Sequence, residues 1–99
     1  ITVYEPTAAD FVGSPTTGLA PLTVDFTNNS SGDYDSILWA FGDGATTTLE
    51  HPTRTYEAVG AYTVTLSVEG LGGSDVETKR AYVLAARSRV YLPLTTREG

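Results

Sequence analysis

The 99-residue chain has no cysteine and no methionine, and it has only one tryptophan and one histidine. Without cysteine there is no disulfide bond, no thiolate nucleophile and no cysteine-based zinc site. Packing must therefore supply the stability that a disulfide would otherwise add. Lysine and arginine are also few, at 6 residues, while threonine, glycine and serine are abundant. This composition favours a location outside the cell or on its surface.

The sequence also lacks any long apolar run and any general excess of basic charge. No segment approaches the ~18 consecutive apolar residues of a membrane-spanning helix. No signal-peptide pattern opens the chain, so we expect a piece cut from a larger protein. The net charge of -6 argues against a nucleic-acid partner, because the phosphate backbone requires a basic surface. We expect a monomer whose first partners are the neighbouring domains of the same chain.

The charge is unevenly distributed. Residues 1–77 contain 11 acids and a single base, Arg54, whereas residues 78–99 contain five bases and one acid. The acidic part is typical of a cation-binding surface or simply a soluble one. The basic end is expected to be a linker, since apolar residues at 91, 92 and 94 interrupt it.

Apolar and polar residues alternate with a period of two through most of the chain. The clearest segment is 62–69, in which Val64, Leu66 and Val68 share one face. Further strands are expected at 9–13, 22–27, 37–41, 46–49, 54–56 and 76–85, and glycine, proline, asparagine and aspartate mark the turns between them. No helical period is sustained. The pattern predicts an all-β, immunoglobulin-like β-sandwich of about seven strands in two antiparallel sheets.

Two aromatic residues sharpen this prediction. Trp39 lies mid-chain between two alternating apolar segments, where immunoglobulin-like sandwiches bury a tryptophan. Tyr62 lies at the start of a strand, two residues before the inward-facing Val64. That is the arrangement of a tyrosine corner, in which the hydroxyl ties a crossover loop to the sheet. We therefore expect Trp39 in the core and the Tyr62 hydroxyl on nearby backbone.

Asp43 lies between two glycines, directly after an apolar segment that ends at Phe41. Such an acid can be a catalytic group, a metal ligand or a turn residue. Glycine supplies positive φ, and aspartate accepts hydrogen bonds from nearby backbone N–H groups, so a turn is the favoured interpretation. A catalytic carboxylate needs a base, a second acid or a metal beside it. The sole histidine, His51, lies in a loop before Pro52, and we expect neither a catalytic residue nor an enzyme.

The segment ILWAFGDGATTTLEHPTRTYEAVGAYTVTLSV, residues 37–68, carries three ordered motifs. They are WAFGDG, then HPTRTY, then GAYTVTLSV, and together they resemble the polycystic kidney disease (PKD) domain family. The resemblance covers about residues 7–85. Ala40 stands where the family usually has aspartate, and Arg54 where histidine is common. We expect both positions near the surface, where neither change threatens the fold.

The resemblance also suggests how the chain is divided. Residues 7–86 form the PKD-like domain, and residues 87–99 form a C-terminal linker or tail. Residues 1–6 are either the closing strand of a preceding copy in a tandem array or the first strand of this domain. Both alternatives stay open at the level of sequence.

The pair Asp33-x-Asp35 lies in a loop of small polar residues and offers two carboxylates on one bend. Calcium takes six to eight oxygen ligands, so such a loop suits it. The resemblance implies the same, because some members of the family bind calcium here with help from an aspartate in the last hairpin, which is Asp75. Their remaining ligands come from the domain start, where Glu5 and Thr7 are nearest. The alternative is a solvated acidic loop that binds nothing.

The resemblance implies a non-catalytic module of a larger multidomain secreted or cell-surface protein. Such a module acts as a spacer or in protein–protein or protein–carbohydrate interaction. The alternative is a calcium-stabilised accessory domain that binds polysaccharide or positions a neighbouring hydrolase catalytic domain. Binding a polysaccharide would need exposed aromatic rings. The candidates are Tyr34, Tyr56, Tyr82 and Tyr91; we expect Tyr34 to be exposed and Tyr56 and Tyr82 to lie at the edge of the core.

Overall fold

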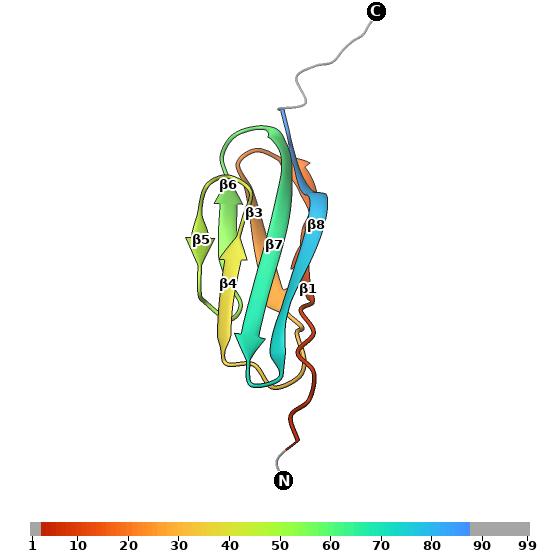
Figure 1. Cartoon of the computed structure of the whole chain (residues 1–99). Coiled ribbons are helices and arrows are strands. Elements are labelled where there is room, and N and C mark those ends of the chain that lie inside the picture. Colours follow the sequence, from red (N-terminus) through yellow and green to blue (C-terminus); the bar gives the residue numbers. More distant parts are fainter. Residues whose placement is uncertain (1–2, 88–99) are drawn as a thin grey trace, which may run out of the picture.

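The computed structural model describes residues 3–87, which form eight β-strands and no helix. Figure 1 shows them as two layers that face each other. The strands are β1 (Phe11–Ser14), β2 (Thr17–Leu19), β3 (Leu22–Asn28), β4 (Ser36–Ala40), β5 (Thr46–Thr47), β6 (Thr53–Tyr56), β7 (Gly60–Gly70) and β8 (Gly73–Ala86). Within this part of the chain, no helix is long and apolar enough to span a membrane.

One sheet has the order β1-β3-β6 and the other the order β2-β8-β7-β4-β5. The predicted β-sandwich is therefore confirmed, with one correction to its antiparallel sheets. Strand β2 pairs with β8 in parallel, from Thr17 opposite Leu84 to Leu19 opposite Ala86. The sequence did not predict β2, because a three-residue strand around a glycine shows no alternation. Strand β5 is also shorter than the predicted 46–49.

The core lies between the sheets and follows the alternation of the strands. Trp39 is completely buried, and its ring packs against those of Phe11 and Phe26, at centroid distances of 5.2 and 5.4 Å. Its Nε1 donates to the Leu49 carbonyl oxygen over 2.9 Å. The prediction that Trp39 is a core residue is confirmed, and the indole N–H is satisfied as a buried donor must be.

Two tyrosines tie loops to the sandwich. The Tyr62 hydroxyl donates to the carbonyl oxygen of Ala58 over 2.6 Å, which confirms the tyrosine corner. The Tyr56 hydroxyl donates to the carbonyl oxygen of Phe41 over 2.9 Å. Tyr56 is completely buried rather than at the edge of the core, because its strand β6 turns the ring inward against Tyr62.

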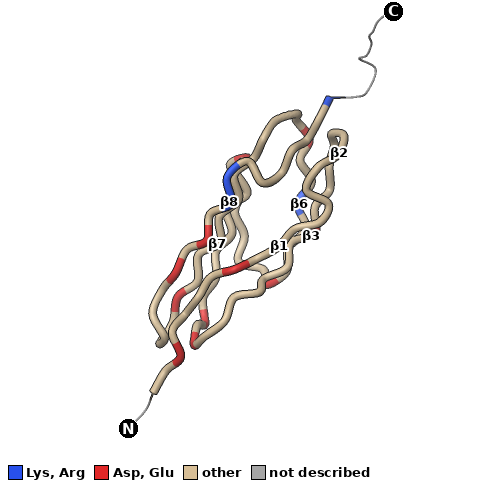
Figure 2. Tube along the Cα trace, turned by 90° about the vertical axis from the view of Figure 1, so that its right-hand side faces the viewer, with Lys and Arg blue, Asp and Glu red and all other residues tan. Residues whose placement is uncertain are grey.

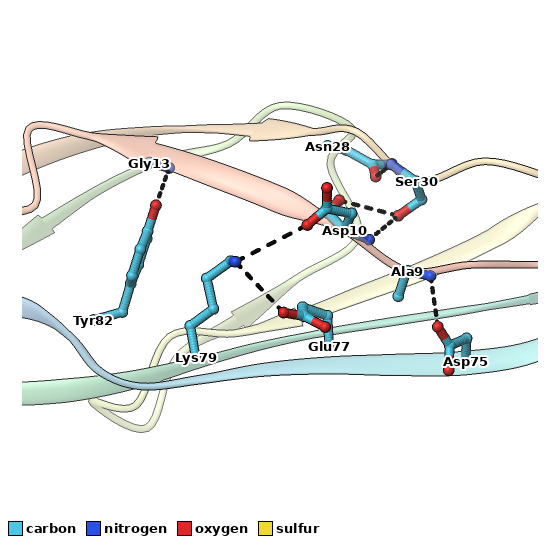
Figure 3. A network of polar contacts seen from close by, with 9 residues as sticks. All are labelled: Ala9, Asp10, Gly13, Asn28, Ser30, Asp75, Glu77, Lys79 and Tyr82. Atoms are coloured by element: carbon cyan, nitrogen blue, oxygen red, sulfur yellow. Dashed lines mark hydrogen bonds and ion pairs between the residues drawn. The ribbon is translucent and has the colours of Figure 1, made fainter.

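Side chains of β8 close the open side of the sandwich next to β1 (Figure 3). The Asp75 carboxylate accepts a hydrogen bond from the Ala9 amide over 2.8 Å, and the Tyr82 hydroxyl accepts one from the Gly13 amide over 2.9 Å. The Gly13 amide belongs to the edge strand β1, and the Ala9 amide lies just before that strand. An edge strand with unpaired amides can pair with another chain, and side chains that cover the amides prevent this.

Lys79 lies on β8 between Asp75 and Tyr82, and its Nζ is 3.4 Å from Glu77 and 4.0 Å from Asp10 (Figure 3). Its ammonium also lies 5.2 Å from the centre of the Phe11 ring. One cation thus joins an acid of its own strand to the acid that precedes β1. Polar contacts therefore link the two sheets here, beside the packing of the Phe11 ring against that of Tyr82.

The two ends of the described chain leave from opposite ends of the sandwich (Figures 1 and 2). Figure 2 shows that most acidic residues gather in the half nearer the N-terminus. That end contains the 28–36 loop and the β7–β8 hairpin, and it is where the predicted calcium ligands lie.

Candidate functional site

The Asp43 turn is structural, as the sequence predicted. The Phe41 amide donates to the Ala45 carbonyl oxygen over 3.1 Å, and the Ala45 amide donates to Asp43 Oδ1 over 3.1 Å. Gly42 and Gly44 have φ values of 86° and 94°, which residues with a Cβ rarely adopt. A Cβ at position 42 would also meet backbone of the neighbouring strand. The carboxylate therefore holds a turn.

Asp43 also binds Arg54 of β6, whose Nε and Nη2 lie 2.8 and 2.7 Å from Oδ2. This contact joins the β4–β5 turn of one sheet to the outer strand of the other. Ala40 and Arg54, the two departures from the family pattern, are half-buried, and the Arg54 side chain is 38% exposed, in keeping with positions near the surface. Arg54 thus has a structural role that its neighbours in the sequence do not reveal.

The N-terminal segment docks onto the loop that contains Asp33. The Glu5 amide donates to Asp33 Oδ2 over 2.6 Å, and the Asp33 amide returns a bond to the Glu5 carbonyl oxygen over 3.2 Å. Thr7 Oγ1 donates to the Asp33 carbonyl oxygen over 3.3 Å, and the Thr7 amide donates to Gly72 of the β7–β8 turn over 3.2 Å. Glu5 and Thr7 therefore lie beside Asp33.

The three predicted calcium ligands do not form one donor set. Asp33 Oδ2 binds the Glu5 amide and Asp75 Oδ2 binds the Ala9 amide, while Asp35 Oδ1 accepts a long bond from the Ser36 hydroxyl. Among residues 3–87, no group of three or more His, Cys, Asp or Glu side chains is arranged to hold a metal ion. Calcium binding at Asp33, Asp35 and Asp75 stays a prediction.

A hollow of about 430 Å³ lies beside Tyr34, between the 28–36 loop and the segment around β5. Its lining consists of Tyr34, Asp35, Ser36, Ile37, Thr48 and Glu50, and we call it the Tyr34 groove. A smaller hollow of about 200 Å³ adjoins it and is lined by Tyr4, Asp33, Tyr34, Asp35 and Leu71. Tyr34 and Asp35 border both, so the two hollows meet at this pair.

Asn28 forms hydrogen bonds to two residues that line the groove. It is the last residue of β3 and only 7% exposed. Its Nδ2 donates to the Tyr34 hydroxyl over 3.2 Å and to Glu50 Oε2 over 3.3 Å, and its backbone amide donates to His51 Nδ1 over 3.1 Å. The sequence analysis missed this residue. The signal was present, because Asn28 continues the inward positions of β3 by one further step of two.

The tyrosines do not form the exposed aromatic surface that the sequence suggested. Tyr34 is half-buried and packs partly against the core, so the expectation that it is exposed is wrong. Its hydroxyl accepts a hydrogen bond from the side chain of the buried Asn28. Tyr56 is buried and Tyr82 is half-buried at the core edge, as expected for Tyr82. Tyr91 lies outside the described residues.

The PKD domain family matches residues 4–85, which is most of the chain and all eight strands apart from the final residue of β8. The chain belongs to the PKD domain family. It is 35% identical over 83 residues to the pre-pro-metalloprotease PrtV of Vibrio cholerae, and 43% identical over 51 residues to the collagenase ColA of Bacillus cereus. These alignments cover 76% and 52% of the chain, but only 9% and 5% of the two relatives.

Solved structures support the same family. A PKD domain of the Vibrio cholerae metalloprotease PrtV superposes with a TM-score of 0.66 at 34% identity, covering 81% of this chain and 99% of that domain. A structure of carbohydrate-binding modules of the β-sandwich superfamily superposes with a TM-score of 0.70 at 30% identity, covering 83% of this chain and 36% of that one. PKD domains thus occur within larger proteins, and this fold is present in about a third of a chain from a study of carbohydrate-binding modules.

Proposed function

We propose that this PKD domain is a non-catalytic, extracellular module of a larger secreted or cell-surface protein. It acts as a spacer between neighbouring domains and contributes contacts to a polymeric partner. The observation that carries the proposal is the position of the chain ends, which leave opposite ends of the sandwich (Figure 1). A domain with this geometry adds its full length to a multidomain chain.

The comparisons support this proposal through the small share of each relative that the chain spans. It spans 9% of a metalloprotease and 5% of a collagenase. Most of each relative therefore lies outside the part that matches this chain. The acid that most resembles a catalytic residue, Asp43, is engaged with Ala45 and Arg54 in a turn.

Protein is the favoured class of polymer, because both of these relatives are named as enzymes that act on proteins. Polysaccharide is the second candidate, favoured by the likeness to carbohydrate-binding modules. A pull-down of the purified chain on insoluble collagen, chitin and cellulose separates the two. Retention on collagen alone supports contact with protein, and retention on a polysaccharide supports the second candidate. No retention on any of the three removes the contact role and leaves the spacer.

We also propose calcium binding at the N-terminal end of the domain. The observation in its favour is that the Glu5 carbonyl oxygen and Thr7 Oγ1 lie beside Asp33, where the resemblance requires ligands. Calorimetry should show binding on the order of 10⁻⁴ M or weaker for the wild type, as in extracellular modules. Asp35→Ala should abolish the heat. Identical flat traces for both proteins would end the proposal.

A further inference from the structure

We propose that the Tyr34 groove binds a lysine or arginine side chain of a protein partner. This inference rests on the proposed function, since it names the chemistry by which the module contacts a protein. It concerns a single hollow at the N-terminal end of the sandwich. The evidence is the charge of the lining, its apolar wall and the buried asparagine that holds it in place.

The lining is acidic and contains no base. Asp35 and Glu50 are its charged residues. Among residues 3–87, the bases that form ion pairs are Arg54, which binds Asp43, and Lys79, which binds Asp10 and Glu77. Asp35 and Glu50 therefore have no cationic partner in this part of the chain. A ligand cation bound at these carboxylates would gain charge-assisted hydrogen bonds.

The same hollow has an apolar wall that suits a long side chain. Tyr34 and Ile37 both line it, and both are half-buried against the core. Lysine and arginine lay their methylene groups along apolar surface and keep the charge at the polar end. A cation near the face of a tyrosine ring gains a further attraction. The volume of about 430 Å³ holds one such side chain together with the backbone that carries it.

The groove is organised before any ligand arrives. The side-chain amide of the buried Asn28 donates to both the Tyr34 hydroxyl and Glu50 Oε2, two groups of the lining. These bonds fix the ring and the carboxylate relative to each other. A site whose groups are already ordered loses less conformational entropy on binding. Asn28 is thus a positioning residue, which acts through the two residues that it holds.

The lining favours a cationic side chain over a neutral sugar. Sugar-binding surfaces present broad aromatic faces, whereas the groove has one tyrosine, half-buried and tied inward by Asn28. Two carboxylates on one small hollow instead select for positive charge. A glucosamine oligomer is positively charged like lysine but has no apolar side chain, so it is the contrasting ligand in the test.

The test is an NMR titration of the 99-residue chain with N-acetyl-lysine methylamide. We expect amide shift changes concentrated at residues 34–37 and 48–50, which weaken as salt is added. N-acetyl-norleucine methylamide, which has the same stem without the charge, should produce clearly smaller changes. Glu50→Gln should bind lysine roughly two- to fivefold more weakly, which is the range for one partly exposed ion pair.

Glu57→Gln is the matched control, because it removes the same charge from an exposed loop between β6 and β7. It should leave the titration unchanged. Glutamine at position 50 can still accept the hydrogen bond from Asn28. Weaker binding of the lysine derivative by Glu50→Gln therefore results from the missing charge and not from a disordered groove. Unchanged chemical shifts elsewhere in the spectrum show that each variant is folded.

Three results would overturn the inference. One is an equal response to lysine and norleucine, and another is an equal loss in Glu50→Gln and Glu57→Gln, which would indicate diffuse electrostatic attraction. The third is stronger binding of the glucosamine oligomer than of lysine. Asp35 lines the groove and is also a predicted calcium ligand, so the titration is carried out in calcium-free buffer, and the substituted residue is Glu50, which is not a predicted ligand. The proposed spacer role is judged separately, by force measurement, and survives any of these results.

Discussion

At the scale of single residues, Trp39 is the largest of the fully buried side chains. It packs against Phe11, Phe26 and Phe41, and its N–H is bound to the Leu49 carbonyl oxygen. We expect Trp39→Ala to lower the free energy of unfolding by about 3–5 kcal/mol, through lost burial and the cavity left behind. In a chain without disulfides, that is a large part of the stability of a small domain.

Urea unfolding followed by circular dichroism measures this loss, since the variant has no tryptophan to follow by fluorescence. Val12→Ala, at a half-exposed position of β1, is the control and should change stability by no more than ~0.5 kcal/mol. A Trp39→Ala protein as stable as the control would mean that the core does not depend on this ring. In the wild type, iodide should fail to quench the indole.

The fold shifts the ionisation of Tyr56. Burial raises the pKa of its hydroxyl well above the ordinary value of about 10, and the nearby Asp43 carboxylate raises it further. The unfolded chain ionises Tyr56 above about pH 10, whereas the folded chain resists ionisation. The stabilising contribution is therefore complete below pH 10 and is lost as the pH rises above it.

Tyr56→Phe makes this contribution measurable. At neutral pH we expect the variant to be less stable by about 1 kcal/mol, because the Phe41 carbonyl oxygen loses its donor. Above pH 10 the wild type should lose its advantage in free energy of unfolding over Tyr56→Phe, by up to about 1.4 kcal/mol per pH unit. Urea unfolding of both proteins between pH 7 and 11 gives the difference. A gap that stays constant across this range would show that the hydroxyl ionises equally in both states.

At the scale of elements, residues 5–9 are held by side chains as much as by backbone pairing. The Asp33 carboxylate binds the Glu5 amide, and the Asp75 carboxylate binds the Ala9 amide. We expect Asp33→Ala to speed hydrogen exchange at the Glu5 amide roughly fivefold, as one hydrogen bond is lost. The amides of β7 should be unaffected, since their ladder is intact.

Asp35→Ala is the control for that experiment, because the Asp35 carboxylate contacts only the neighbouring Ser36 hydroxyl. It removes the same charge from the same loop and should leave exchange at Glu5 unchanged. Equal acceleration in both variants would indicate that the loop as a whole, and not the Asp33 carboxylate, holds the segment. Adding calcium to the wild type shows whether the ion strengthens this docking.

At the scale of the whole molecule, the parallel pairing of β2 with β8 determines how the domain resists pulling. The bonds include Ala20 N to Ala86 O at 2.9 Å and Leu84 N to Thr16 O at 2.7 Å. Because the chain ends leave opposite ends of the sandwich, a pull on them drives β2 and β8 in opposite directions along their length. All bonds of the pair are then loaded together.

Single-molecule stretching by the chain ends should therefore give a distinct force peak. The control is the same domain held at Val59 and Arg87. There the pull opens the antiparallel β7–β8 ladder from the pair Gly60 and Ala85, one bond at a time. That geometry should yield at clearly lower force. A domain that yields at negligible force when pulled by its ends would remove the spacer role.

Much of this fold could be predicted from alternation alone. The period of two showed which face of β3, β4 and β7 is buried, and it identified Trp39 as core and Tyr62 as a tyrosine corner. The Asp43 turn was also predictable, since glycine and aspartate determine local backbone geometry within a few residues. The strand β2 was not, because its pairing with β8 joins residues far apart in the chain.

The candidate site, like the fold, could be predicted from the sequence only in part. The sequence alone determined the strand pattern, the family motifs, the acidic character of residues 1–77 and the absence of any thiol chemistry. Only the tertiary structure decided that Asn28 lies beneath Tyr34 and Glu50, and that Asp33 binds Glu5. The physical reason is that alternation reports which face of a strand avoids water, a property of neighbouring residues. A groove depends on which distant loops meet, and that is settled by the packing of two whole sheets.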